Sequence, residues 1–392
     1  MRSAILSAAL AALIPFASAA DAVKGAAEGF AKGVTGGGNA KPVYPTTNAQ
    51  LVSYLKDNTP RVIVLTKTFD FTGTEGTATE VGCAPWGTSN KKCQTAINKN
   101  NWCTDLNAKA PKVTVKYDKA AQYPMIVGSN KSIIGQSNKG VIKGKGFRIT
   151  NKASNIIIQN IHITNLNPQY VWGGDAISLD NSDLVWIDHV KTSLIGRQHI
   201  VLGNGPAGRV TISNSEIDGQ TSWSATCDGH HYWGLYLTGD KGLVTLKGNY
   251  IHHTSGRAPK VGGNTRLHAV NNLWSDNTNH AFEVDGNVQI VAEGNIFQNV
   301  KAPAQTPMKG KVFTSPNASA NAQVSIMSPT YGMMGCKAYL GHNCQVNAYS
   351  GSGNFVGTDA SALSAFKGYN VAAAGDANAA KTLAAKAGFG RI

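Results

Sequence analysis

Several charged or aromatic residues recur at similar distances before short apolar segments. Asp175, Arg197, Trp233, Arg257 and His280 each precede the next such segment by 10 to 13 residues. If the segments are strands of stacked coils, this spacing places the side chains on one face, with neighbouring strands about 4.8 Å apart. An aspartate and two arginines on one face form a candidate site, although this spacing alone does not select a reaction. The alternative is a surface ion pair, which contributes little.

Aromatic residues gather around these charged positions. Trp172, Trp223, Tyr232, Trp233 and Tyr236 all fall in the same part of the chain. Aromatic faces stack on the apolar face of a sugar ring, while neighbouring charges bind its oxygens. The combination predicts a carbohydrate-binding groove, although Trp172 and Trp233 could equally be core residues.

The segments that must position these residues repeat along the chain. Each is a short strand with alternating apolar residues that ends in a polar residue, typically Asn. Their first residues are separated by 29, 25, 34, 23 and 23 residues. The segments are 156–160, 185–189, 210–214, 244–249, 267–272 and 290–295.

A period of about two dozen residues is typical of repeat architectures. The period contains β-branched strands and turns but no helical stripe, so it favours a parallel β-helix over helical or leucine-rich repeats. A β-sandwich, which also has short strands and turns, is the alternative. Asn is repeated near the bend, where it tolerates left-handed backbone and can hydrogen-bond to the coils above and below. These residues are Asn160, Asn214, Asn249, Asn272 and Asn295.

The ends of the repeat have their own patterns. Residues 48–58 read as a short amphipathic helix that caps the open N-terminal end of the coils. The tail, about 355–392, is Ala-rich and is predicted to cover the other end or an outer face. We expect one catalytic domain over 21–392, with repeating coils over about 125–330.

The first twenty residues predict export. Residues 1–20 have a positive start, an apolar stretch too short to span a membrane, and small residues for cleavage. The six cysteines all follow this segment, and an even number in a secreted chain predicts three disulfides. Their spacing does not resemble a zinc site, and only Cys336 and Cys344 are paired by proximity. Two glycosylation sequons begin at Asn130 and Asn317.

The net charge of +14 is compatible with several anionic partners. No basic run exceeds two residues and no nucleic-acid-binding module is recognisable, so we expect neither nucleic acid nor a membrane as partner. A solvated basic surface is the simplest interpretation. A partly acidic cell-wall polymer would also be attracted to it.

With these residues in view, the chain resembles the fungal pectin lyases, which form part of the pectate lyase superfamily (polysaccharide lyase family 1). The resemblance extends over nearly all of the mature chain. It rests on long stretches around the charged residues and on the N-terminal Ala27-Glu28-Gly29-Phe30-Ala31 with its following glycines. The longer stretches are Val185-Trp186-Ile187-Asp188-His189, Gly196-Arg197-Gln198-His199-Ile200, residues 225–234 and residues 255–261.

The resemblance implies an all-β fold, a right-handed single-stranded parallel β-helix. It implies Arg257 as the catalytic base, with Arg197 and Asp175 beside it. Implied substrate-binding residues are Trp102, Trp172, Tyr232, Trp233, Tyr236 and Lys260. Implied disulfides are Cys83–Cys103, Cys93–Cys227 and Cys336–Cys344. Pectate lyases hold calcium where Arg197 stands here, so its guanidinium takes the place of the metal and no cofactor is expected.

The implied reaction is β-elimination in methyl-esterified galacturonan by a secreted, monomeric enzyme. The base removes the C5 proton of a uronate ring, and the O4 glycosidic oxygen leaves. A methyl ester acidifies C5 more than a carboxylate does, because the intermediate then carries one negative charge instead of two. Neutral arginine is scarce at neutral pH, so partial desolvation and neighbouring Lys260 must favour that form, and high pH should help.

Three other functions remain open. A calcium-dependent pectate lyase would lose activity in the presence of a chelator. A polygalacturonase-like hydrolase would need a pair of carboxylates, for which Asp175, Asp180 and Asp188 are candidates. A non-catalytic pectin-binding adhesin would release no unsaturated product.

Overall fold

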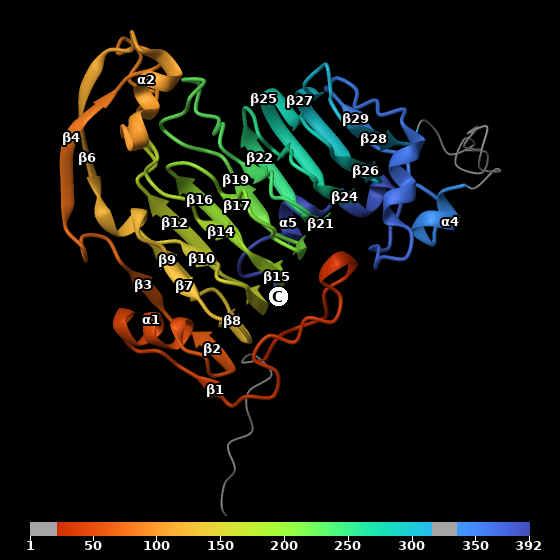
Figure 1. Ribbon diagram of the computed structural model, residues 1–392, viewed down its shortest axis with the longest axis horizontal. Helices are drawn as coiled ribbons and strands as arrows, with labels where there is room; N and C mark the ends of the chain where they lie inside the picture. The colour runs from red at the N-terminus through yellow and green to blue at the C-terminus, as the bar shows by residue number, and fades with distance from the viewer. Residues whose placement is uncertain (1–21, 316–334) are drawn as a thin grey trace, which may run out of the picture.

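The computed structural model describes residues 22–315 and 335–392 as stacked parallel coils (Figure 1). The expected signal peptide, 1–20, and the sequon at Asn317 lie outside the described residues. The strands follow one another in sequence order from one end of the stack to the other (Figure 1). The fold is therefore the expected parallel β-helix. Among the described residues, no helix has both the length and the apolar character to cross a bilayer.

Most coils contribute one strand to each of three parallel sheets. Sheet 1 contains β1 (Pro42–Val43), β2 (Arg61–Leu65), β8 (Lys131–Gly135), β11 (Ala153–Gln159), β15 (Ser182–Asp188), β18 (Arg209–Ser213), β21 (Leu243–Lys247), β24 (Arg266–Val270), β26 (Gln289–Glu293) and β28 (Lys311–Thr314). Sheet 2 contains β3 (Thr68–Asp70), β9 (Val141–Lys143), β12 (His162–Leu166), β16 (Lys191–Ile195), β19 (Glu216–Asp218), β22 (Tyr250–Thr254), β25 (Leu273–Val284), β27 (Ile296–Ala304) and β29 (Ala348–Ser350).

Sheet 3 positions the residues with which the sequence analysis began. It contains β7 (Met125–Val127), β10 (Phe147–Ile149), β14 (Ile177–Leu179), β17 (Ile200–Leu202), β20 (Leu235–Leu237), β23 (Lys260–Val261) and the end of β25. Because β25 continues without a break from sheet 2 into sheet 3, the two sheets form one hydrogen-bonded network there.

The spacing of the repeated segments in the sequence corresponds to the strand pairing of sheet 1. The first residues of the six repeated segments are directly paired, which confirms the alignment and places the longer insertions in loops. These residues are Ile156, Val185, Val210, Val244, Leu267 and Ile290. Their side chains are fully buried inside the coils, in one continuous core with the inward residues of sheets 2 and 3.

The asparagine stack differs in part from expectation. Asn249, Asn272 and Asn295 form a buried ladder, in which each backbone N–H donates to the amide oxygen of the next. Asn347, which the sequence analysis missed, ends it. Asn160 and Asn214 do not belong to this ladder, because they sit one position earlier at the bend, with positive φ of 56° and 47°. There Asn is used for its left-handed backbone.

Both chain ends cover the outside of the coils. Helix α1 (Asn48–Lys56) buries Leu51 and Leu55 in the core at the N-terminal end of the stack, as predicted. The tail covers an outer face: Phe366 packs with Phe30 over sheet 1, and α5 (Leu383–Lys386) packs on sheet 2. Near its end the tail reaches early coils, where the Gly390 N–H donates to Asn160.

One long excursion leaves the stack between β3 and β7. It contains the antiparallel pair β4 (Thr77–Cys83) and β6 (Lys112–Asp118), the short β5 (Thr95–Ala96) and α2 (Trp102–Asn107). Strand β5 pairs with β13 (Tyr170–Val171), at the edge of the candidate site. The disulfides Cys83–Cys103 and Cys93–Cys227 fix this excursion, and Cys336–Cys344 closes the loop around α4 (Cys336–Leu340). All three pairs are those that the resemblance implies.

The asparagine ladder yields a stability prediction. Asn272→Ala should lower the free energy of unfolding by about 3 kcal/mol, because it leaves the buried Asn249 N–H and Leu246 carbonyl without partners. Asn287→Ala is the matched control: Asn287 also stacks on an Asn of the neighbouring coil, but it is exposed. Chemical denaturation of both variants measures the difference. Equally small decreases in the unfolding free energy of both variants would show that the buried ladder stabilises the fold no more than an exposed Asn pair does.

Candidate active site

The backbone pairing of sheet 3 brings the phase-matched residues to one face. Asp175, Trp233, Arg257 and His280 occupy equivalent positions of four coils, two residues before the aligned residues of sheet 3. Arg197 lies one residue earlier than this shared position. The coil of Arg197 and the coil of Arg257 are two strand steps apart, about 10 Å. The sequence count therefore located the face correctly.

Arg197 is held on one side by a carboxylate and on the other by a ring. Its Nε lies 3.3 Å from Asp175 Oδ1, and its guanidinium lies 3.8 Å from the centre of the Trp172 ring. The Arg197 carbonyl accepts a hydrogen bond from Nε2 of His231, 2.7 Å away. Burial lowers the pKa of His231 to about 4, so this imidazole is a neutral donor. The guanidinium is therefore a fixed positive charge at the surface of the groove.

Arg257 sits in a cage of aromatic rings. Its guanidinium lies 5.5, 4.9 and 5.1 Å from the ring centres of Tyr232, Trp233 and Tyr236. Its backbone adopts φ of 45°, in the left-handed region. The Nε of Arg257 lies 3.6 Å from Oε2 of Glu283. Such rings attract the cation to their faces and remove water from around it.

Glu283 organises the surroundings of Arg257, and the sequence analysis did not find it. It forms an ion pair with Lys260, its direct partner across strands β23 and β25. The Tyr232 hydroxyl and His280 Nε2 lie 3.5 and 3.8 Å from its Oε2. Burial alone would raise the pKa of Glu283, but bonds from His280 and Lys260 and the charge of Arg257 lower it to about 2. Only the strand register could have revealed this residue.

The predicted aromatic residues play different roles. Trp233 is 8% exposed, and its Nε1 donates to Gln94, so it supports Arg257 instead of offering a free stacking face. Trp102, from α2 of the excursion, makes edge contacts with Trp172 and Trp233, both at 6.4 Å between ring centres. Trp102, Trp172, Tyr232 and Tyr236 remain partly exposed and can line a groove.

The carboxylates proposed for a hydrolase are not arranged as an acid–base pair. Asp188 is almost fully buried on sheet 1 and accepts hydrogen bonds from Ser213 and Asn214. Asp180 lies 3.6 Å from Arg148 in an ion pair, and Asp175 pairs with Arg197. Each carboxylate therefore has a positive or hydrogen-bonding partner of its own.

Potential metal ligands gather elsewhere. Two clusters among the described residues bring three His or carboxylate groups together, and neither includes Asp175. In the cluster of Glu216, Asp218 and His252, the Lys191 ammonium already lies 2.8 and 3.0 Å from the two carboxylates.

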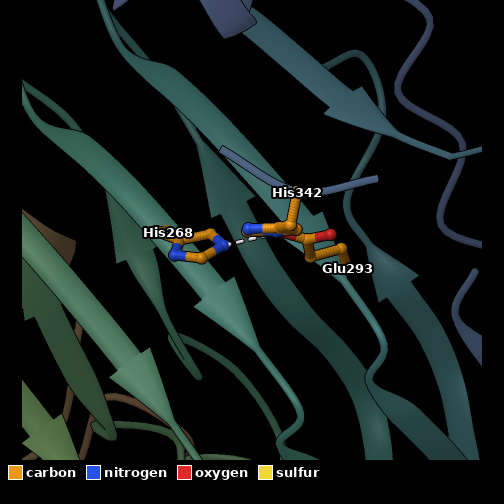
Figure 2. Close-up of side chains that lie close together, drawn as sticks. All are labelled: His268, Glu293 and His342. Atoms are coloured by element: carbon orange, nitrogen blue, oxygen red, sulfur yellow. Dashed lines mark hydrogen bonds and ion pairs between the residues drawn. The ribbon is translucent and has the colours of Figure 1, made fainter. Parts of the chain in front are cut away.

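The other cluster joins the disulfide loop to sheet 1. His268, Glu293 and His342 point toward one another (Figure 2), and both His Nε2 atoms lie 2.8 Å from the same oxygen of Glu293. The other oxygen accepts from the Gln345 N–H at 2.8 Å. These are hydrogen-bond lengths, and they satisfy a carboxylate that is 1% exposed. We interpret the cluster as an anchor for the C-terminal segment.

Comparison with known proteins agrees with the fold. The sequence profile described as "Pectate lyase" matches residues 91–391. A pectin lyase of Colletotrichum gloeosporioides is 67% identical, and a probable pectin lyase A of Aspergillus fumigatus is 58% identical, each over the full length of both chains. A pectate lyase of Bacillus sp. N165, solved in complex with trigalacturonate, superposes with a TM-score of 0.56 at 20% identity, over 93% of this chain and 99% of that one.

These matches define a polysaccharide lyase of the parallel β-helix type. The chain belongs to the pectate lyase family and, within it, to the fungal pectin lyases.

The Glu293 anchor should make stability depend on acid. Burial raises the pKa of Glu293, but the bonds from His268 and His342 outweigh it and lower this pKa to about 2, from 4.5. The carboxylate therefore stabilises the fold fully above pH 4.5, and this contribution, on the order of 3 kcal/mol, is lost as the pH falls toward 2.

Denaturation of the wild type and Glu293→Gln between pH 6 and 2 measures this contribution. The difference in unfolding free energy should shrink as the pH falls, whereas exposed Asp105→Asn should follow the wild type throughout. A difference that does not change with pH would show that Glu293 acts only through its shape.

Proposed function

We propose that this protein cleaves methyl-esterified galacturonan by β-elimination and needs no calcium. The observation that carries the proposal is the pair of arginines on one face of sheet 3: Arg197 against Asp175, and Arg257 within its aromatic cage. High identity to fungal pectin lyases over the full chain supports the substrate.

In the proposed mechanism Arg257, in its neutral form, takes the C5 proton of a uronate ester. The electron pair of the C5–H bond moves toward the ester carbonyl, and Arg197 stabilises the resulting negative charge. The enolate then re-forms its carbonyl, a double bond forms between C4 and C5, and the O4 glycosidic bond breaks. The leaving oxygen takes a proton from water. A preorganised cation in a partly dry site stabilises such a charge better than water does.

The surroundings of Arg257 fit this role. Glu283 contacts Nε, the inner nitrogen of the guanidinium, and so orients the terminal nitrogens. Glu283 also contacts Lys260 and His280, so Arg257 is one of several partners of this carboxylate. The three rings hold the guanidinium in place beside the groove.

Export is part of the proposal. Three disulfides support a protein that works in an oxidising, extracellular environment, where pectin is found. Glycosylation at Asn130 and Asn317 and a monomeric state stay predictions. Asn130 is partly buried, and its side-chain oxygen accepts a hydrogen bond from Asn155 at 2.8 Å.

Arg257→Lys should lower kcat at least about 100-fold and change KM little, because general-base catalysis is typically worth that much. The rate is followed by the ultraviolet absorbance of the 4,5-unsaturated product from highly esterified pectin. Arg266→Lys is the matched control, since Arg266 also lies over a tyrosine ring but on sheet 1. Near wild-type turnover in Arg257→Lys would remove Arg257 from the role of base.

Excess chelator should leave cleavage of highly esterified pectin unchanged, because Arg197 supplies the positive charge. The same absorbance assay, with and without chelator and with added Ca²⁺, measures this. Loss of activity that Ca²⁺ restores would instead favour a calcium-dependent pectate lyase. Release of reducing ends without absorbance would indicate hydrolysis, and binding without product would indicate an adhesin.

A further inference from the structure

A hollow lined by positively charged side chains lies next to Arg197, toward the N-terminal coils. It is a cavity of about 90 Å³, and the residues that matter for its chemistry are Lys99, Gln122, Arg148, Trp172, Asp175 and Arg197. A water molecule occupies about 30 Å³ of liquid, so the cavity can hold a group of carboxylate size.

The charges around this hollow do not balance. Three lining side chains are cations, and the one lining acid, Asp175, is already paired with Arg197. Lys99 holds its ammonium 5.6 Å from the centre of the Trp172 ring and has no carboxylate within ion-pair distance among the described residues. Arg148 forms a long ion pair, 3.6 Å, with Asp180, which does not line the hollow. The hollow therefore attracts an anion.

The hollow lies on the same track as the candidate active site. Arg148, Ser178, Val201, Tyr236 and Lys260 are paired in one continuous register across β10, β14, β17, β20 and β23. Their side chains share one side of sheet 3, because paired residues of parallel strands point to the same face. A polymer that follows this row from Lys260 reaches Arg148 after four strand steps, about 19 Å.

We infer that Lys99 and Arg148 form a subsite for an unesterified galacturonate residue, next to Arg197 on the side of the N-terminal coils. This inference rests on the proposed function. A carboxylate there would gain charge-assisted hydrogen bonds, whereas a methyl ester, which is neutral, would leave the Lys99 ammonium without an anionic partner. The enzyme then needs an ester at the cleavage point but selects a free acid at this neighbouring position.

The test compares two substrates for each variant: fully methyl-esterified pectin and a partly de-esterified pectin. The quantity measured is the ratio of kcat/KM on the partly de-esterified substrate to kcat/KM on the esterified one. In the double variant Lys99→Gln/Arg148→Gln this ratio should fall about tenfold. Controls are Arg209→Gln, which removes another arginine paired with an aspartate, and Lys381→Gln, an exposed lysine of the tail. Neither should move the ratio.

Inhibition gives an independent readout. Unesterified trigalacturonate should inhibit cleavage of fully esterified pectin, and its inhibition constant should rise about tenfold in the double variant. In the wild type that constant should also rise with salt, because about 1 M salt shortens the screening length to about 3 Å. An unchanged ratio with an unchanged inhibition constant would overturn the subsite, as would an equal loss of rate on both substrates. Absence of wild-type cleavage of esterified pectin would instead overturn the proposed function.

Discussion

The constraint on which the structure depends is the exact alignment of parallel coils. Side chains alternate between the two faces of a strand, so a slip of one residue would turn every core residue outward. The aligned residues from Ile156 to Ile290 fix that register in sheet 1. The same register places Asp175, Trp233, Arg257 and His280 at equivalent points of sheet 3. Core packing and site geometry thus have one origin.

The two arginines of the site are built in a similar way. Each has its Nε near a carboxylate and its guanidinium against aromatic rings: Arg197 with Asp175 and Trp172, Arg257 with Glu283 and its three rings. Long flexible side chains lose entropy when they are held, and such contacts hold them before a ligand arrives.

The rest of the chain protects and completes this arrangement. The excursion from β4 to β6, fixed by two disulfides, brings Trp102 and Lys99 to the groove. The tail shields the apolar outer faces of sheets 1 and 2, and the buried Glu293 ties its disulfide loop to β24. The ends of a solenoid need such covering, because they have no neighbouring coil to bury their apolar surface.

The sequence by itself determined what is periodic or local. The spacing of β-branched segments predicted the parallel β-helix and its register, and counting residues from those segments located the face that carries Arg197 and Arg257. Resemblance to a family supplied the disulfide pairs, the lyase reaction and the proposed base. The tertiary structure decided what depends on contacts between coils. Glu283 lies near Arg257 because the pairing of β23 with β25 places it opposite Lys260. Trp233 is buried where Gln94, from the distant excursion, contacts it. Asn160 lies outside the ladder because it sits one position earlier at the bend. Asn347 belongs to the ladder although it is 52 residues beyond Asn295 in the sequence. Neither a one-residue offset in a bend nor a contact across an insertion leaves a trace in local spacing, so only the folded chain could show them.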